Sequence, residues 1–478
     1  MARRATPSVD GAEKLLNDCE IVPEGLIEMA DRLKKWSQSY LNLLYEKRQR
    51  PHGEDYLRGL LSDLERKSVE PITERLGQYR RPLQYFIGGS DWDHGPLLDM
   101  LNQQVAQELG EPNGILVGDP SAMPKKGMES VGVARQWCGR LGKQDNCQVG
   151  VYLGYVSNKG HTLVDEELYL PREWARNQAR REKCRVPKKL RFKTAHRLTL
   201  EMLARRRETL PHRWFVADAE FGNPAGFRQK LQQMGERYLL EIRSNLRVRD
   251  IKAPAPKENG GKRGRPWRAP FVQARVWMAT LKKEDWKPFH IRDGTKGPVM
   301  VSAACARVQT MDRRRCSKRV QWLVVIKSDE KVPEYSYYFS NAEEDVTLGE
   351  MVHVASARYW IEDCFERAKG KVGLDHYEVR SWQGWHHHMT FALMALYFLV
   401  LEQRRLSERT PVITVQQTAE AIGEIFRNPE IDLRKLAFKL TNRLRRSEQT
   451  RIDHWRKFHR LPPSWVITRS NHVPSYAL

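Results

Sequence analysis

Two aspartates in this sequence stand directly after short apolar runs. We expect a strand over residues 115–117 to end at Asp119 and a strand over residues 214–217 to end at Asp218. Open α/β sheets bind ligands beyond the carboxyl ends of their strands, so the two carboxylates would converge if these strands are neighbours. Taken singly, either aspartate could equally be the residue that turns the chain out of its strand.

A third acidic position lies on a predicted helix far along the chain. Arg358, Glu362, Glu366 and Lys369 are spaced so that they share one helical face, and the opposite face is apolar. A solvated face of ion pairs would have the same pattern. However, a charged stripe on a largely buried helix needs a purpose, because burying unpaired charge is costly. A few carboxylates are enough to bind Mg²⁺, which takes oxygen ligands and retains waters.

The elements that would position the two aspartates follow the order β-β-β-α-β-α-β. The clearest start and stop signals belong to a helix that begins at Pro224, with Asn223 as its N-cap and Gly235 as the residue that ends it. The predicted strands cover 115–117, 147–156, 161–170, 214–217 and 238–242, and the predicted helices cover 195–207 and 224–234.

Different patterns flank this unit. Residues 25–109 are predicted to be helical, with one helix starting near Trp92 and capped by Ser90 or Asp91. Residues 244–341 are predicted to be β-rich, and helices return from 348 to 401. A basic amphipathic helix is predicted over 433–444. The strands expected in the β-rich part cover 271–278, 299–303, 321–326 and 335–339.

The composition indicates a polyanionic partner. The chain has 82 Lys and Arg against 59 Asp and Glu, which gives a net charge of +23. The longest apolar stretch, Met389–Leu401, is too short to span a bilayer and predicts a buried helix. The seven cysteines include no C-x-x-C pair, which excludes the common zinc-ribbon spacings and disfavours a disulfide framework. We therefore expect a cytoplasmic protein that binds nucleic acid.

Three motifs in order resemble those of DDE-type transposases from bacterial insertion sequences. They are DPSAMPKKG from Asp119, followed by SVGVARQ; FVADAEFG, which contains Asp218; and Arg358-x3-Glu362-x6-Lys369. The last resembles the Y-R-E-K signature of the branch with a β-rich insertion before the glutamate. Two departures are Ala355, where the signature has tyrosine, and Glu220, where many relatives have glycine.

The resemblance implies an α/β fold with an RNase H-like catalytic core, β-β-β-α-β-α-β-α, interrupted by the β-rich insertion. It also implies a helical N-terminal domain and a helical C-terminal tail. The domains would be a helical DNA-binding domain (1–110), the first part of the core (111–243), the insertion (244–343), the second part of the core (344–405) and a basic helical region (406–478).

The activity implied is binding of the terminal inverted repeats of a mobile element, cleavage at its ends and joining of those ends to target DNA. Two Mg²⁺ ions, with Mn²⁺ as a substitute, would carry the phosphodiester chemistry. Asp119 would bridge both ions, and Asp218 and Glu362 would each complete one. The partners implied are double-stranded DNA and a second copy of the chain when the ends are synapsed, in a bacterial, nucleoid-associated setting.

Several basic residues are candidate DNA contacts. Arg358 and Lys369 would face the phosphates beside the cut, and Lys125 and Lys126 would either do the same or be solvated loop lysines. Arg263 and Arg265, in the run KRGRP, resemble a minor-groove hook, although a flexible basic connector has the same composition.

Aromatic and histidine residues elsewhere have less specific patterns. Residues 386–388 are three consecutive histidines, which cannot chelate one ion together, so we expect them at an interface or facing DNA. We expect the tryptophans of the insertion to lie in its core rather than to stack on a DNA base; they are Trp277, Trp286 and Trp322.

Two other functions are compatible with the same motifs. One is an RNase H-like nuclease that cleaves without joining. The other is a captured transposase that acts only as a DNA-binding regulator. The intact set of three carboxylates disfavours the second, because a pure binder has no need of them beside phosphate.

Overall fold

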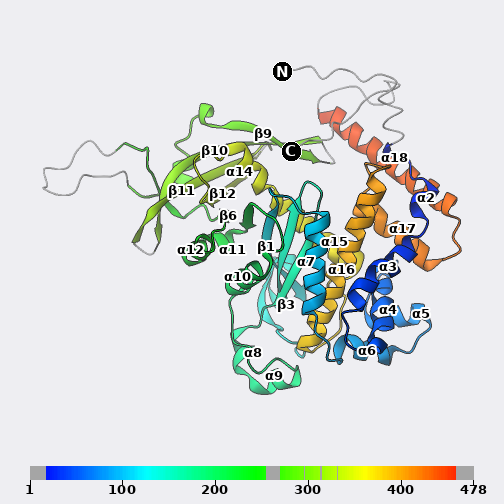
Figure 1. Ribbon diagram of the computed structural model, residues 1–478. Helices are drawn as coiled ribbons and strands as arrows, with labels where there is room; N and C mark the ends of the chain where they lie inside the picture. Colours follow the sequence, from blue (N-terminus) through cyan, green and yellow to red (C-terminus); the bar gives the residue numbers. More distant parts are fainter. Residues whose placement is uncertain (1–17, 255–269, 295–296, 313–314, 331, 459–478) are drawn as a thin grey trace, which may run out of the picture.

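The computed structural model describes residues 18–254, 270–294, 297–312, 315–330 and 332–458. In this part of the chain twelve strands form one mixed sheet, with helices on both of its faces. The central strands lie in the middle of the molecule, with the strands of the β-rich segment on one side. Most of the N- and C-terminal helices lie on the other side (Figure 1).

The central strands confirm the predicted order of β elements. They are β1 (Ile115–Pro124), β3 (Lys143–Ser157), β4 (Gly160–Leu168), β5 (Trp214–Ala217) and β6 (Tyr238–Ile242). β1 runs antiparallel to β3, which runs antiparallel to β4. On its other side β1 runs parallel to β5, and β5 runs parallel to β6. β1 therefore lies between an antiparallel and a parallel neighbour.

The expectation that the first strand ends at Asp119 was wrong. Parallel pairing with β5 stops at Gly118 opposite Ala217, but antiparallel pairing with β3 carries β1 on to Pro124. Asp119 is therefore the first residue past the parallel section, inside a longer strand. The sequence analysis also missed β2 (Ala134–Cys138), which pairs with the start of β3.

The β-rich segment extends the same sheet. Its strand β12 pairs antiparallel with β6 of the central strands, and a second, smaller core lies among its own strands. The strands of the segment are β7 (Arg247–Asp250), β8 (Val272–Gln273), β9 (Lys287–Gly294), β10 (Gly297–Asp312), β11 (Arg315–Ser328) and β12 (Tyr335–Ser340).

The strand expected over 271–278 was wrong beyond Gln273. Helix α13 (Ala274–Met278) follows instead, because one turn of helix directs both Ala274 and Trp277 into the small core. Trp277 is buried, as expected of a core residue, and Trp286 and Trp322 are partly buried. Trp277 donates a hydrogen bond from Nε1 to Asp250 Oδ2 at 3.1 Å, and Trp322 donates one from Nε1 to Glu343 O at 3.3 Å.

The predicted N-terminal helical region is confirmed. Its helices are α2 (Pro23–Leu26), α3 (Met29–Leu41), α4 (Arg50–Leu61), α5 (Val69–Leu76), α6 (Arg80–Gly88) and α7 (Gly95–Glu108). The predicted start of the last helix was wrong. α7 begins at Gly95 after His94, because Pro96 fits only the first turn of a helix. Trp92 is buried before the helix, and its Nε1 donates to Phe86 O at 3.0 Å.

Helices also connect the central strands. They are α8 (Arg172–Arg176), α9 (Gln178–Lys183), α10 (Ala195–Arg206), α11 (Ala219–Gly222) and α12 (Ala225–Gln233), and short 3₁₀ turns occur at Lys47–Gln49, Gly139–Leu141 and Lys283–Asp285. The predicted N-cap of α12 was wrong, because Pro224 holds that position and the Asn223 side chain instead accepts from Arg243 N at 2.9 Å. Gly235, with φ +80°, follows the helix as predicted.

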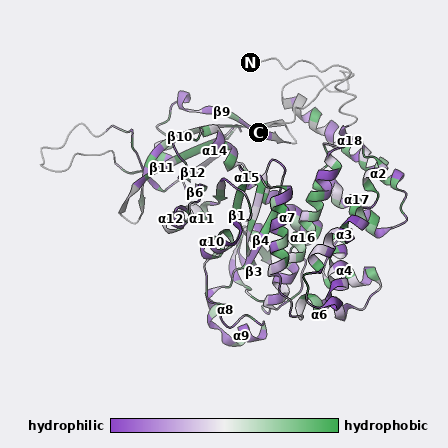
Figure 2. Ribbon diagram, in the orientation of Figure 1, coloured by the Kyte–Doolittle hydropathy of each residue, from purple (hydrophilic) through white to green (hydrophobic). Residues whose placement is uncertain are grey.

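The described chain after β12 is helical, as predicted for residues 348–401 and 433–444. Its helices are α14 (Leu348–Ala355), α15 (Ala357–Val372), α16 (Trp382–Ser407), α17 (Val415–Arg427) and α18 (Leu433–Phe458). The apolar stretch Met389–Leu401 forms the buried middle of α16 and packs against β4. Hydrophobic residues gather on α16 and on the strands beside it (Figure 2). None of the described helices has the length and apolar character needed to cross a membrane.

Candidate active site

Two glycines define which helix covers each face of the central sheet. A Cβ atom on Gly118 of β1 would lie 2.9 Å from Thr199 Cγ2 of α10. On the other face, a Cβ atom on Gly154 of β3 would lie 2.2 Å from Ile361 Cδ1 of α15. The helices therefore approach the sheet where side chains are absent. Because side chains alternate along a strand, Asp119 points to the face covered by α15.

Asp119 and Asp218 follow the last paired residues of two neighbouring parallel strands, β1 and β5. Asp218 also begins α11, since its Oδ1 accepts from Glu220 N at 2.9 Å and from Phe221 N at 3.3 Å. The turn-forming role that the sequence left open for Asp218 is therefore real. This role occupies Oδ1, whereas Oδ2 accepts no hydrogen bond from the described residues.

Helix α15 brings a glutamate and an arginine to the same place. Arg358 Nη2 lies 3.4 Å from Glu362 Oε1, one helical turn away. The same guanidinium forms an ion pair with Glu241 on β6. The Glu362 side chain is 63% exposed, and Glu366 is exposed as well. The acidic half of the predicted stripe therefore faces solvent, whereas Arg358 is largely covered.

The electrostatics of Asp119 link these charges. Burial raises the pKa of Asp119 to about 8; Arg358 and Lys369 oppose that rise, and the carboxylates of Asp218 and Glu362 add to it. No hydrogen-bond donor contacts the Asp119 carboxylate among the residues that the structure describes. The structure thus brings together Asp119, Asp218 and Glu362, which we call the carboxylate cluster, with two cations beside it.

Glu241 was missed by the sequence analysis. It lies on β6, and burial raises its pKa while Arg358 opposes the shift. One signal was available: Glu241 is the only charged residue between Tyr238 and Ile242, in an otherwise apolar strand. A charged side chain in a central strand needs a partner, and Arg358 is that partner.

The other predicted basic residues lie in different surroundings. Lys369 is on α15, half-buried, with Nζ 5.7 Å from the Phe365 ring centroid. Lys125 is not a solvated loop lysine, because its Nζ donates a hydrogen bond to the backbone oxygen of Tyr377 at 3.2 Å. The same nitrogen lies 3.4 Å from the centroid of the Tyr377 ring. Lys126 is exposed. Arg263 and Arg265 lie outside the described residues.

The three consecutive histidines are buried, so the expectation that they could face DNA was wrong. His387 bonds the carbonyl oxygens of Ile87 at 3.0 Å and Trp92 at 2.8 Å. His388 lies 2.7 Å from the Tyr56 hydroxyl. These residues join α16 to the N-terminal helices, which matches the alternative expectation of an interface.

Comparison with known proteins identifies the family. Residues 39–298, more than half of the chain, match the family described as "DDE superfamily endonuclease". The match includes both aspartates of the carboxylate cluster and ends before α14. The chain is also 28% identical over 326 residues to the "Probable transposase for insertion sequence element IS701" of Microchaete diplosiphon, which covers 66% of this chain and 73% of that protein. The chain therefore belongs to the DDE superfamily endonucleases and is an enzyme of the DDE transposase type.

Proposed function

We propose that this protein is the transposase of an insertion sequence, which binds the terminal inverted repeats, cleaves at the ends and joins them to target DNA. The observation that carries the proposal is the carboxylate cluster: three acids from β1, from the end of β5 and from α15 meet around Asp119. The net charge of +23 supports DNA as the substrate.

We also infer an RNase H-like core. The supporting observation is the order β4-β3-β1-β5-β6, in which the first three strands are antiparallel and the last two continue in parallel. The predicted domain limits of 110, 243, 343 and 405 remain part of this proposal. So do synapsis of two DNA ends by two copies of the chain and a location at the bacterial nucleoid.

The donor set of the carboxylate cluster fits divalent metal ions, which DDE endonucleases generally use. All of its ligand atoms are oxygens, which Mg²⁺ and Mn²⁺ accept. Asp119 has neither a described hydrogen-bond donor nor a cation in direct contact. In this proposal Asp119, Asp218 and Glu362 hold two Mg²⁺ ions, with Mn²⁺ as a substitute. When bound, such ions activate the attacking oxygen and stabilise the leaving oxygen of a phosphodiester.

The protein's own cations would position the DNA. Arg358 and Lys369 lie on the helix that carries Glu362, so they would contact phosphates next to the scissile bond. Glu241 would hold the Arg358 guanidinium in place before DNA arrives, because their ion pair is largely covered by the fold.

A cleavage assay with defined metals tests the function. A labelled duplex carrying the element's own ends is expected to be cut in Mg²⁺ or Mn²⁺. In Ca²⁺, whose looser coordination misplaces the reacting groups, it should be bound but barely cut. Joined products with target plasmid support the transposase. Cutting without joining would favour the nuclease, and binding without cutting in any metal would favour the regulator. Full cleavage in EDTA would refute the metal site.

We predict that Arg358→Ala and Lys369→Ala lose more in cleavage rate than in affinity for the ends. A cation beside the reacting phosphate stabilises charge that develops only in the transition state. The matched controls are Arg445→Ala and Arg446→Ala, at exposed positions on α18. If these two contact phosphates, each should weaken binding and reduce the salt slope of log K by about 0.9.

The measurements are binding at several salt concentrations and single-turnover cleavage at saturating protein. Should Arg358→Ala lower affinity while the saturated cleavage rate stays unchanged, Arg358 is a remote phosphate contact. The proposed active-site face of α15 would then be wrong.

A further inference from the structure

Outside the carboxylate cluster, three side chains that commonly bind metals meet in the interior. His94 precedes the first turn of α7, Glu166 lies on β4, and His386 lies in the first turns of α16. One ligand atom from each lies within 4.8 Å of those from the other two. The three residues come from distant parts of the chain, so this cluster forms only in the folded protein.

Two of these side chains carry buried polar atoms without a partner among the described residues. Glu166 Oε1 lies 2.9 Å from His386 Nδ1, but Glu166 Oε2 and His386 Nε2 have no hydrogen bond. Both side chains are almost fully buried. Leaving such atoms unpaired costs free energy, and each case in a folded protein calls for an explanation.

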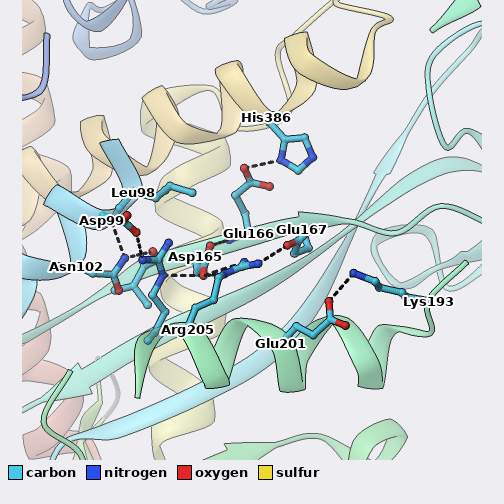
Figure 3. Close-up of polar contacts among 12 residues, drawn as sticks. Leu98, Asp99, Asn102, Asp165, Glu166, Glu167, Lys193, Glu201, Arg205 and His386 are labelled. Atoms are coloured by element: carbon cyan, nitrogen blue, oxygen red, sulfur yellow. Dashed lines mark hydrogen bonds and ion pairs between the residues drawn. The ribbon is translucent and has the colours of Figure 1, made fainter. Parts of the chain in front are cut away.

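The neighbouring carboxylate provides an internal comparison. Asp165, next to Glu166 on β4, is also fully buried, but Arg206 Nε at 2.8 Å and Arg205 Nη2 at 3.1 Å neutralise it. Figure 3 shows Arg205 reaching Asp165 and Glu167 from one side of the strand and His386 reaching Glu166 from the other. No Lys or Arg forms a salt bridge with Glu166 among the described residues.

Metals bind the neutral form of imidazole and the ionised form of a carboxyl group, so an ion bound here would displace any proton that Glu166 carries.

We propose that His94, Glu166 and His386 bind one divalent transition-metal ion, for which Zn²⁺ is the best match to two imidazole nitrogens and one carboxylate. Zinc bonds to these atoms are about 2.0–2.2 Å long, so two ligand atoms of one ion lie at most about 4.4 Å apart. The ligand atoms, which lie within 4.8 Å of one another, must therefore move slightly closer when the ion binds. His94 is the least buried of the three residues.

This site is separate from the carboxylate cluster. Glu166 pairs with Tyr152, and Tyr152 pairs with Asp119, so the three residues form one row across three strands. Two strand spacings separate Glu166 from Asp119 by about 10 Å. The buried Tyr152 lies between them. The ion would therefore join α7, β4 and α16 as a structural site, apart from cleavage.

The metal content of the purified full-length chain tests the proposal. After growth with added zinc and dialysis without chelator, mass spectrometry of the metals should find about one zinc per chain. His94→Ala and Glu166→Gln should lose it. His94 makes no capping hydrogen bond, so its replacement leaves α7 intact. His353→Ala, at an exposed histidine on α14, and Asp119→Asn should keep the zinc.

Circular dichroism and calorimetry complete the test. Each variant should keep the wild-type spectrum, and metal-free wild-type protein should take up added ZnCl₂ whereas His94→Ala should not. Cobalt in place of zinc should give no thiolate charge-transfer band. The proposal is overturned if the wild type neither contains nor takes up zinc, or if His94→Ala and Glu166→Gln keep it. It is equally overturned if Asp119→Asn loses zinc or if cobalt reports cysteine ligands.

Discussion

Asp119→Asn, Asp218→Asn and Glu362→Gln are each expected to lower the cleavage rate at least about a thousandfold, with the affinity for end DNA nearly unchanged. Each change removes one ligand charge at almost constant size. Loss of metal assistance removes several kcal/mol of transition-state stabilisation, and about 4 kcal/mol corresponds to a thousandfold. The measurements are single-turnover cleavage at saturating protein and binding in Ca²⁺.

The folds of these variants should survive. An asparagine at position 218 can still accept the hydrogen bonds that begin α11. Asp119→Asn should raise the melting temperature in metal-free buffer at neutral pH. Burial raises the pKa of Asp119 to about 8, so its carboxyl group must bind a proton when the chain folds, whereas an amide need not.

Two acids in the same motifs serve as matched controls. Glu220 follows Asp218 by two residues, and Glu366 lies one turn beyond Glu362, and both are exposed. Glu220→Gln and Glu366→Gln should cleave at near wild-type rates. If Glu362→Gln cleaves normally and Glu366→Gln does not, the assignment of the third ligand is wrong.

Gly154→Ala is expected to slow cleavage about a hundredfold, although Gly154 lies outside the carboxylate cluster. The added methyl group would lie 2.2 Å from Ile361 Cδ1, so the Ile361 side chain must move. Because that side chain is fully buried, we expect α15 to move with it, away from the sheet. Glu362 is the next residue on that helix, and a displacement of about 1 Å costs about a hundredfold in rate. The measurement is single-turnover cleavage, with the melting temperature as a check on folding.

A compensating change makes this prediction specific. Ile361→Val deletes Cδ1, the atom that would clash, and the next nearest atom, Cγ1, is 3.5 Å from the added methyl group. The double variant should recover most of the rate. Gly370→Ala, on the same helix where an added Cβ would have nothing within 4 Å, should be neutral. If the double variant is as slow as Gly154→Ala, the close approach of α15 does not position Glu362.

Much of the central fold could be predicted from local sequence patterns. The apolar runs before Asp119 and Asp218 predicted both strands, and their register, with Gly118 opposite Ala217, confirms that the strands are neighbours. The helical spacing of Arg358 and Glu362 likewise placed both on one face of a helix. These features depend on residues close together in the sequence.

Features that depend on distant partners were not predictable. Hydrophobic periodicity does not say which strand pairs with which, so the pairing of β12 with β6 could not be foreseen. The role of Glu241 depends on Arg358 of a later helix. His387 and His388 were expected either at an interface or facing DNA, and the sequence could not decide between the two, because nothing near them reveals the carbonyl and hydroxyl groups that they bond.

The late position of α15 in the chain has a consequence during translation. A ribosome that has released the chain only through β12 has made both aspartates, but Glu362 is still to come. The nascent protein, and any fragment cut short before α15, therefore holds two of the three carboxylates. On the proposed function, DNA cleavage therefore becomes possible only after the helix that completes the carboxylate cluster has been synthesised and docked.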